Sequence, residues 1–192
     1  MKKLSTGKIA AIVIGAILLI FIFFGIGSYN NLVGLKETVN TQSSNIDTQL
    51  QRRTDLIPNL VNTVKSYAAH ETGIMTAVSE ARAKLAGATT VTDKANANAE
   101  LTGALNRLIA ISENYPDLKA NTTYIQLMDE LAGTENRISV SRQDYNSAAK
   151  KYNSSIKTFP NVIFANIFGF SGADYFEAQS NATTVPSVDF ES

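Results

Sequence analysis

Apolar residues follow two different patterns along this chain, one continuous and one periodic. From Ile9 to Gly27 no residue is charged or strongly polar. As a helix with a rise of 1.5 Å per residue, this run spans about 28 Å, which is close to the hydrocarbon thickness of a bilayer. The pattern predicts that residues 1–28 form a short N-terminal tail and one transmembrane helix.

A cleaved signal peptide is the main alternative for this segment. Its apolar core is normally about 7–15 residues long and ends in a small-residue cleavage site. Here the run is longer, and it ends in bulky residues that include Phe23 and Phe24. The sequence therefore favours a retained membrane anchor.

After residue 28 the apolar positions recur every three or four residues, which is the spacing of amphipathic helices. The four resulting stripes are formed by Leu32, Leu35, Val39, Ile46 and Leu50; by Leu56, Ile57, Leu60, Val61, Val64, Ala68, Met75, Val78 and Leu85; by Leu101, Leu105, Leu108 and Tyr115; and by Met128, Leu131, Ile138, Tyr145, Ala149, Tyr152 and Ile156. Heptad-like stripes of this kind are typical of helices that pack about 20° from antiparallel. We predict an all-α fold, in which the transmembrane helix precedes an antiparallel up-and-down four-helix bundle.

Turn-forming residues between the stripes set the predicted helix boundaries. Asp55 before Pro58 suits a helix start, and the residue before Pro116 avoids the helical region of backbone space. The predicted helices cover residues 29–52, 55–86, 93–115 and 118–157. The alternative is that Pro58 and Pro116 lie within helices as kinks, which would give two very long helices in one hairpin.

Large apolar residues crowd the segment that follows Pro160. It is too short to span a membrane, so it caps the bundle, docks at the membrane surface or binds a partner. Its candidate interaction residues are Phe164, Phe168, Phe170, Tyr175 and Phe176. We assign residues 29–177 to one helical domain that includes this segment, and we expect residues 178–192 to form a flexible tail.

Composition and charge narrow the function. The chain has 17 basic and 17 acidic residues, and because Lys2, Lys3 and Lys8 precede the apolar run, the remainder is mildly acidic. A mildly acidic domain is a poor nucleic-acid binder. The same lysines predict a cytoplasmic N-terminus and a domain on the outer or periplasmic side.

Charged residues on apolar faces are candidates for a structural polar network. Glu135 and Arg142 interrupt the fourth stripe seven residues apart, on one helix face, and buried charges persist only when they are paired. The candidate members of this network are Arg53, Glu71, Arg82, Glu113, Glu135 and Arg142. A network that sets helix register is the favoured interpretation, and a binding or switching role is the alternative.

Residues for catalysis or cofactor binding are sparse. The chain has one histidine and no cysteine, it lacks the repeated Glu-x-x-His pairs of a di-iron bundle, and no Gly-rich phosphate loop occurs. We therefore predict no enzymatic activity, no catalytic residues, no metal, no cofactor and no small-molecule substrate.

Several short motifs in a fixed order resemble the LemA family of bacterial membrane-anchored proteins. The matching stretches are Arg52-Arg53 with Asp55-Leu56-Ile57-Pro58, Ala81-Arg82, Glu113-Asn114-Tyr115-Pro116, Thr134-Glu135-Asn136, Arg142, Tyr145-Asn146, Tyr152-Asn153, Phe159-Pro160, Phe168-Gly169-Phe170 and Tyr175-Phe176. The likeness covers roughly residues 29–177. It implies a helical bundle and brings no catalytic residues. It also implies a short N-terminus outside the cell, opposite to the orientation that the lysines predict.

Together these features predict a membrane-anchored helical scaffold or adaptor of the bacterial cell envelope. It contacts lipid through one N-terminal helix, and it acts by forming a homo-oligomer or by binding other envelope proteins. The alternative is a lipid-engaging membrane-remodelling protein that uses residues 162–176.

Overall fold

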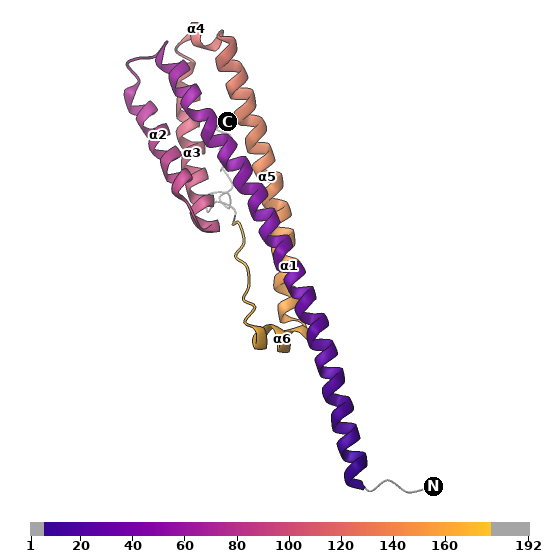
Figure 1. Cartoon of the computed structure of the whole chain (residues 1–192). Coiled ribbons are helices and arrows are strands. Elements are labelled where there is room, and N and C mark those ends of the chain that lie inside the picture. Colours follow the sequence, from indigo (N-terminus) through magenta and orange to yellow (C-terminus); the bar gives the residue numbers. More distant parts are fainter. Residues whose placement is uncertain (1–5, 178–192) are drawn as a thin grey trace, which may run out of the picture. The chain divides into compact units, whose positions relative to one another are not determined.

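A computed structural model gives the structure of the protein and describes residues 6–177. These residues contain helices and no strand (Figure 1). The helices are α1 (Thr6–Lys65), α2 (Thr72–Gly87), α3 (Val91–Ser112), α4 (Pro116–Lys119), α5 (Thr122–Lys157) and α6 (Asn161–Phe168). The all-α class is confirmed for this part of the chain. The flexible tail predicted at residues 178–192 lies outside it.

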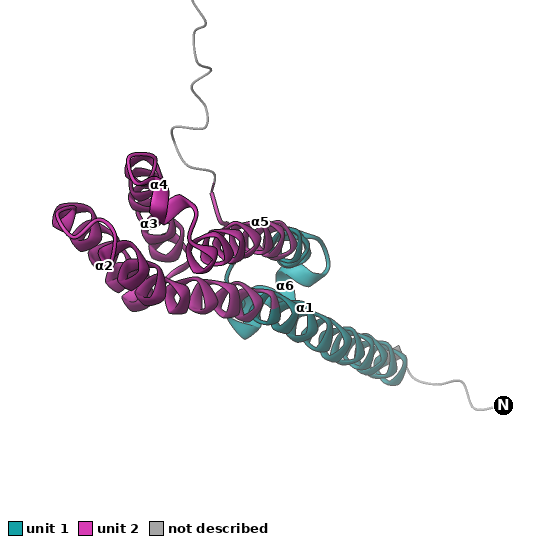
Figure 2. Cartoon of the chain, turned by 90° about the horizontal axis from the view of Figure 1, so that it is seen from above, with its two compact units in different colours: residues 1–41, 147–173 teal, residues 42–146, 174–192 magenta. Residues whose placement is uncertain are grey.

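The chain divides into two compact units, which Figure 2 shows in different colours. Unit 1 comprises residues 1–41 and 147–173, and unit 2 comprises residues 42–146 and 174–192. Helices α1 and α5 each contribute residues to both units.

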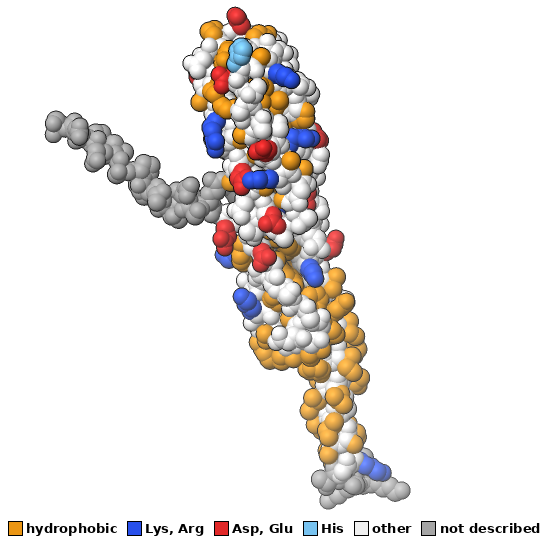
Figure 3. All heavy atoms as spheres, turned by 90° about the vertical axis from the view of Figure 1, so that its left-hand side faces the viewer, with side chains coloured by type: hydrophobic (Ala, Val, Ile, Leu, Met, Phe, Trp, Pro, Cys, Tyr) orange, Lys and Arg blue, Asp and Glu red, His pale blue; other side chains and the backbone are white. Residues whose placement is uncertain are grey.

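Unit 1 contains the apolar run of α1, and its side chains there are mostly exposed. Ile12 is 61% exposed and Phe23 is 74% exposed, although a water-soluble core would bury such residues. On the face shown in Figure 3, hydrophobic side chains cover this part of the helix. Within the described residues, α1 is the one helix that is long and apolar enough to cross a membrane.

Unit 2 holds its core between helices whose predicted stripes face inward. The fully buried apolar residues in this unit include Ile46, Ile57, Leu60, Val78, Leu101, Leu108, Leu118 and Ile138. Full burial of one such side chain contributes about 1.5–3 kcal/mol. The stripes therefore supply the main stabilisation of unit 2, and α2 packs closely on α3.

The predicted boundary between helices 29–52 and 55–86 is wrong. Helix α1 runs without a break to Lys65, with Pro58 inside it. Proline has no N–H, so the carbonyl four residues earlier, that of Thr54, loses its helical partner. The Nε of Arg82 on α2 donates to this carbonyl oxygen at 2.8 Å. A partner from another helix thus satisfies the group that Pro58 leaves open.

The predicted helix 55–86 is also interrupted, because α1 ends at Lys65 and α2 begins at Thr72. The apolar spacing continues across this break, from Ala68 to Met75, and so does not mark it. The boundaries of the later helices lie close to those predicted. Thr90 caps α3 by accepting a hydrogen bond from the N–H of Asp93. Pro116 starts the short α4, where a missing N–H has no cost. Pro58 therefore lies within a helix, whereas Pro116 marks a break between helices.

Because the Thr54 carbonyl accepts from Arg82 in place of the N–H that Pro58 lacks, substitutions at positions 82 and 58 should be coupled. Arg82→Met should lower the free energy of unfolding by about 1–3 kcal/mol, because a buried acceptor is left unsatisfied. In a Pro58→Ala background the N–H gained at position 58 donates to the Thr54 carbonyl, so Arg82→Met should lower the free energy of unfolding by much less. Denaturant unfolding of the full chain in detergent, followed by circular dichroism, measures both values.

Arg107→Met, on the exposed surface of α3, is the matched control and should be nearly neutral in both backgrounds. Equal costs of Arg82→Met with and without Pro58 would contradict the coupling.

Candidate functional site

A buried arginine lies at the centre of the polar contacts of unit 2. The side chain of Arg53 on α1 is only 4% exposed. One terminal nitrogen donates to Asn98 Oδ1 at 2.6 Å and forms an ion pair with Glu135, and the other donates to Thr102 Oγ1 at 3.1 Å. The guanidinium thereby joins α1 to α3 and α5.

The residues on either side of Arg53 extend these contacts. The Thr54 carbonyl accepts from Arg82 on α2. Arg52 forms an ion pair with Glu130 on α5 at 2.7 Å, but both side chains are about half exposed. Exposed pairs contribute little to stability, about 0–1 kcal/mol. The buried contacts of Arg53 and Thr54, which involve every other long helix of unit 2, are therefore the ones that matter.

The charges at this centre are unbalanced. Arg142 on α5 places its Nε and one terminal nitrogen in the interior without a hydrogen-bond partner, and its guanidinium lies 5.6 Å from the ring centre of Phe176. Burial lowers the pKa of both Arg53 and Arg142, and the charge of Glu135 opposes that shift in each case. Arg142 lowers the pKa of Arg53 further. The carboxylate of Glu135 thus interacts favourably with the guanidinium groups of both Arg53 and Arg142.

The other predicted network members lie in separate contacts. Glu71 accepts a hydrogen bond from the Tyr115 hydroxyl at 3.1 Å, and this bond raises the pKa of Tyr115. Glu113 pairs with Lys119 at the surface. The structure thus brings Arg53, Glu135 and Arg142 together, whereas Glu71 and Glu113 lie apart from them.

Sequence reasoning missed the two partners that α3 supplies to Arg53. Asn98 is 2% exposed, and it lies three residues before Leu101 in the third stripe. A polar residue at an apolar stripe position is a signal that would have found it. Thr102 carries no comparable signal.

An extended segment after α6 is held by two tyrosine–asparagine pairs of α5, one in each unit. In unit 2, Asn146 Nδ2 donates to the carbonyl of Phe176 and its Oδ1 accepts from the Phe176 N–H, both at 2.9 Å. The Tyr145 hydroxyl donates to the carbonyl of Asp174. Burial raises the pKa of Tyr145, and the charge of Asp174 adds to this shift.

The same arrangement occurs in unit 1. Asn153 Nδ2 donates to the carbonyl of Ala173 and its Oδ1 accepts from the Ala173 N–H, both at 2.8 Å, while the Tyr152 hydroxyl donates to the carbonyl of Ser171. The two pairs lie seven residues apart in sequence, and the residues they bind lie three apart. Both pairs bind backbone groups, so they hold this segment without reading its side chains.

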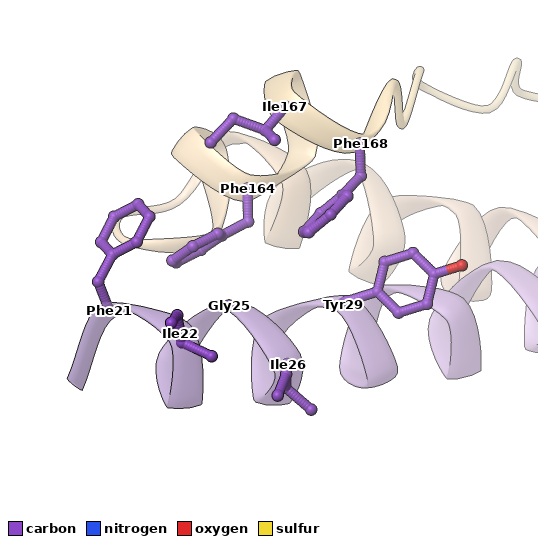
Figure 4. Close-up of a pocket in the computed structure, with 8 residues that line it drawn as sticks. All are labelled: Phe21, Ile22, Gly25, Ile26, Tyr29, Phe164, Ile167 and Phe168. Atoms are coloured by element: carbon purple, nitrogen blue, oxygen red, sulfur yellow. The ribbon is translucent and has the colours of Figure 1, made fainter. Parts of the chain in front are cut away.

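One predicted interaction residue of unit 1, Phe164, packs against the apolar run of α1 (Figure 4). Phe164 on α6 is buried, and its ring centre lies 5.0 Å from that of Phe21. A Cβ atom at Gly25 would lie 3.0 Å from the Phe164 ring, so glycine permits this close approach.

Two further rings of unit 1 pack on Tyr29. Phe168 and Phe170 meet it edge to face, with centre separations of 5.0 and 5.7 Å. At the start of α6, the Ser28 hydroxyl donates to Asn161 Oδ1 at 2.9 Å. Aromatic and polar contacts therefore hold α6 against α1.

The two predicted interaction residues of unit 2, Tyr175 and Phe176, differ in burial. Phe176 is buried and packs edge to face on Tyr145, with ring centres 5.2 Å apart. Tyr175 is 43% exposed. The five predicted residues thus form two separate groups.

No cluster of His, Asp and Glu among residues 6–177 is placed to hold a metal ion. Arginine side chains keep their proton in proteins, so the buried guanidiniums bind and orient groups without transferring protons. The geometry favours holding helices together over acid–base chemistry.

The LemA family model matches residues 42–190, which is most of the chain. The chain belongs to the LemA family. Two similar proteins are the magnetosome protein MamQ 2 of Paramagnetospirillum magneticum, 29% identical over 95% of this chain and 78% of that protein, and the protein LemA of Metamycoplasma hominis, 28% identical over 73% of this chain and 64% of that protein. The magnetosome protein MamQ of Magnetospirillum gryphiswaldense is 30% identical over 81% of this chain and 67% of that protein.

Several motifs that carry the LemA resemblance coincide with the contacts described above. The Arg53 stretch supplies the buried guanidinium, Arg82 binds the open carbonyl, and Thr134-Glu135-Asn136 contains the carboxylate. Tyr145-Asn146 and Tyr152-Asn153 hold the extended segment. In this LemA-family chain these motifs therefore supply contacts between helices and to the backbone.

Because Glu135 is the carboxylate near both Arg53 and Arg142, substitutions of Glu135 and Arg142 should affect stability differently. Glu135→Gln should lower the free energy of unfolding by about 1–2 kcal/mol, because Arg53, which is only 4% exposed, loses its carboxylate, while the 38% exposure of the Glu135 side chain lets water offset part of the loss. Arg142→Met should stay within about 1 kcal/mol of the native chain, because it removes buried N–H groups that have no partner. Thermal and denaturant unfolding of the full chain in detergent compare the two variants.

Glu130→Gln is the matched control, since it removes a half-exposed carboxylate from the same helix. A Glu135→Gln variant no less stable than this control would contradict the central role of the carboxylate.

Proposed function

We propose that this LemA-family chain is a non-enzymatic, membrane-anchored helical scaffold or adaptor of the bacterial cell envelope. It would act by self-association or by binding other envelope proteins. The observation that carries the proposal is the continuity of α1 from Thr6 to Lys65. One helix contains both the apolar run and Arg53, whose contacts organise unit 2, so the anchor and the structural centre belong to the same element.

Two further observations support a role without catalysis. The terminal nitrogens of Arg53 and the Nε of Arg82 bind side chains or the backbone of other helices, as expected of contacts that specify structure. The names of the similar proteins, magnetosome protein MamQ and protein LemA, state no enzymatic activity.

We also infer how the chain is organised for this role. Residues 1–28 would form the tail and anchor, and residues 29–177 the helical domain. The part of α1 in unit 2 would form an up-and-down four-helix bundle with α2, α3 and α5. The reversal of chain direction between successive long helices in Figure 1, together with the contacts of Arg53 and Arg82, supports this arrangement.

Flanking charge supports an orientation for the anchor. Lys2, Lys3 and Lys8 precede the apolar run, whereas only Lys36 follows it closely. By the positive-inside rule the N-terminus would lie in the cytoplasm and the helical domain on the outer or periplasmic side.

A single introduced cysteine tests self-association and orientation together, because the chain has none. Thr76→Cys lies at an exposed position of α2. In intact cells it should react with a membrane-impermeant maleimide, and a maleimide–benzophenone reagent, whose photoactivated ketone inserts into nearby C–H bonds, should link it to a second copy or to another envelope protein. Gel analysis and mass spectrometry identify the products.

Ser5→Cys, on the other side of the apolar run, is the matched control and should react only after permeabilisation. An unlinked monomer without any co-purifying protein would contradict the scaffold proposal. Reaction of Thr76→Cys only after permeabilisation would reverse the orientation.

A second candidate function is favoured by the position of α6 on α1. Phe164 sits against Gly25, which lies within the apolar run, and the neighbouring Ile167 and Phe168 are 61% and 48% exposed. Exposed apolar residues beside a spanning segment suit contact with lipid. This candidate is a lipid-engaging protein that remodels the membrane through residues 162–176.

Tryptophan quenching tests this candidate, because the chain contains no Trp. Phe168→Trp in the full chain, reconstituted in phosphatidylcholine vesicles with brominated acyl chains, should lose much of its fluorescence. Val140→Trp, at an exposed position of α5 in unit 2, is the control and should keep its fluorescence. Equal fluorescence of Phe168→Trp in brominated and ordinary vesicles would remove the lipid-engaging candidate.

A further inference from the structure

An apolar groove lies between α1 and α6 within unit 1 (Figure 4). Its volume is about 390 Å³, within the usual range of about 300–1,000 Å³ for sites that hold small organic molecules. The lining residues are Phe21, Ile22, Gly25, Ile26, Tyr29, Phe164, Ile167 and Phe168. Among these side chains, the hydroxyl of Tyr29 is the only polar group.

The walls of the groove are set by contacts already described. Phe164 reaches the backbone of α1 at Gly25, and Phe21 and Tyr29 pack on rings of α6 on either side. Ile22, Ile26 and Ile167 leave more than half of their surfaces exposed along the groove. The groove is therefore open along its length and continuous with the apolar surface of α1.

The position of the groove limits what fills it. Four of its five α1 residues lie within the apolar run that ends at Gly27, and Tyr29 lies just beyond. Water is a poor occupant, since the lining offers it almost no hydrogen-bond partner. An empty groove would forfeit the dispersion contacts of its lining. In a membrane, the hydrocarbon chains of the surrounding lipid are the material available to occupy it.

We propose that the groove between α1 and α6 holds one acyl chain of a bilayer phospholipid. An unbranched chain matches an open channel between two helices, and the rings of Phe21, Phe164 and Phe168 provide flat apolar walls. The headgroup end of this lipid lies at Tyr29, where a tyrosine ring with a polar tip suits the membrane interface. This inference deepens the second candidate function and rests on contact between α6 and lipid.

Photocrosslinking tests the groove directly. The full chain is reconstituted in phosphatidylcholine vesicles that contain a small fraction of phosphatidylcholine with a diazirine in its acyl chain. After irradiation, digestion and mass spectrometry, lipid adducts should appear on residues of both walls, including Phe164 and Phe168. Ile22→Trp and Ile26→Trp, which place a larger side chain in the groove, should each reduce the α6 adducts several-fold.

Leu19→Trp is the matched control, because Leu19 lies on the same helix, is 59% exposed and does not line the groove. It should leave the α6 adducts unchanged. Unaltered α6 adducts in both groove variants would overturn the proposal, as would lipid adducts on α1 with none on α6.

The quenching and photocrosslinking results together distinguish contact of α6 with the bilayer from a bound acyl chain. If the fluorescence of Phe168→Trp is quenched by brominated lipid but the groove variants label like the native chain, α6 touches the bilayer without a bound acyl chain. If α6 is neither quenched nor labelled while α1 is labelled, the lipid-engaging function and the groove proposal are both wrong.

Discussion

The buried guanidinium of Arg53 is the constraint on which the arrangement of unit 2 depends. A charge with so little exposure is stable only where a carboxylate and neutral acceptors surround it. Those groups come from two other helices, as Asn98 and Thr102 on α3 and Glu135 on α5. Sliding either helix by one turn, about 5.4 Å, would remove them from reach. We infer that Arg53 fixes register, whereas the apolar stripes fix only which faces meet.

The sequence predicts the helices well because periodicity is a local property, and it fails where a distant residue decides. The stripes place most of the buried residues of unit 2 correctly. Pro58 suggests a boundary, but α1 continues because Arg82, on a different helix, supplies the donor that the proline removes. Likewise, the pattern selects Arg53, Glu135 and Arg142 as candidates but does not tell which of them meet, since that depends on how the helices pack.

The membrane-facing part of the chain shows a similar dependence on one small residue. Gly25 is inconspicuous among the apolar residues of α1, yet its missing side chain is what lets Phe164 seat against the helix backbone. No charge or periodicity marks such a contact in the sequence. Because the short α6 rests there, its apolar face becomes continuous with the anchor, which a search for spanning segments alone would overlook.

The paired tyrosines and asparagines of α5 constrain how this protein varies in evolution. They bind main-chain N–H and carbonyl groups, so these contacts require an N–H at Ala173 and Phe176 and do not depend on the side chains there. Proline is therefore the unsuitable residue at those two positions. The side chain of Phe176 is constrained separately, by its packing on Tyr145. The spacing between Ala173 and Phe176 is more tightly constrained, because an inserted or deleted residue between these two positions would remove the hydrogen bonds to one of the two asparagines. Among homologues, the length of residues 171–176 is therefore expected to be conserved, together with an apolar residue at position 176.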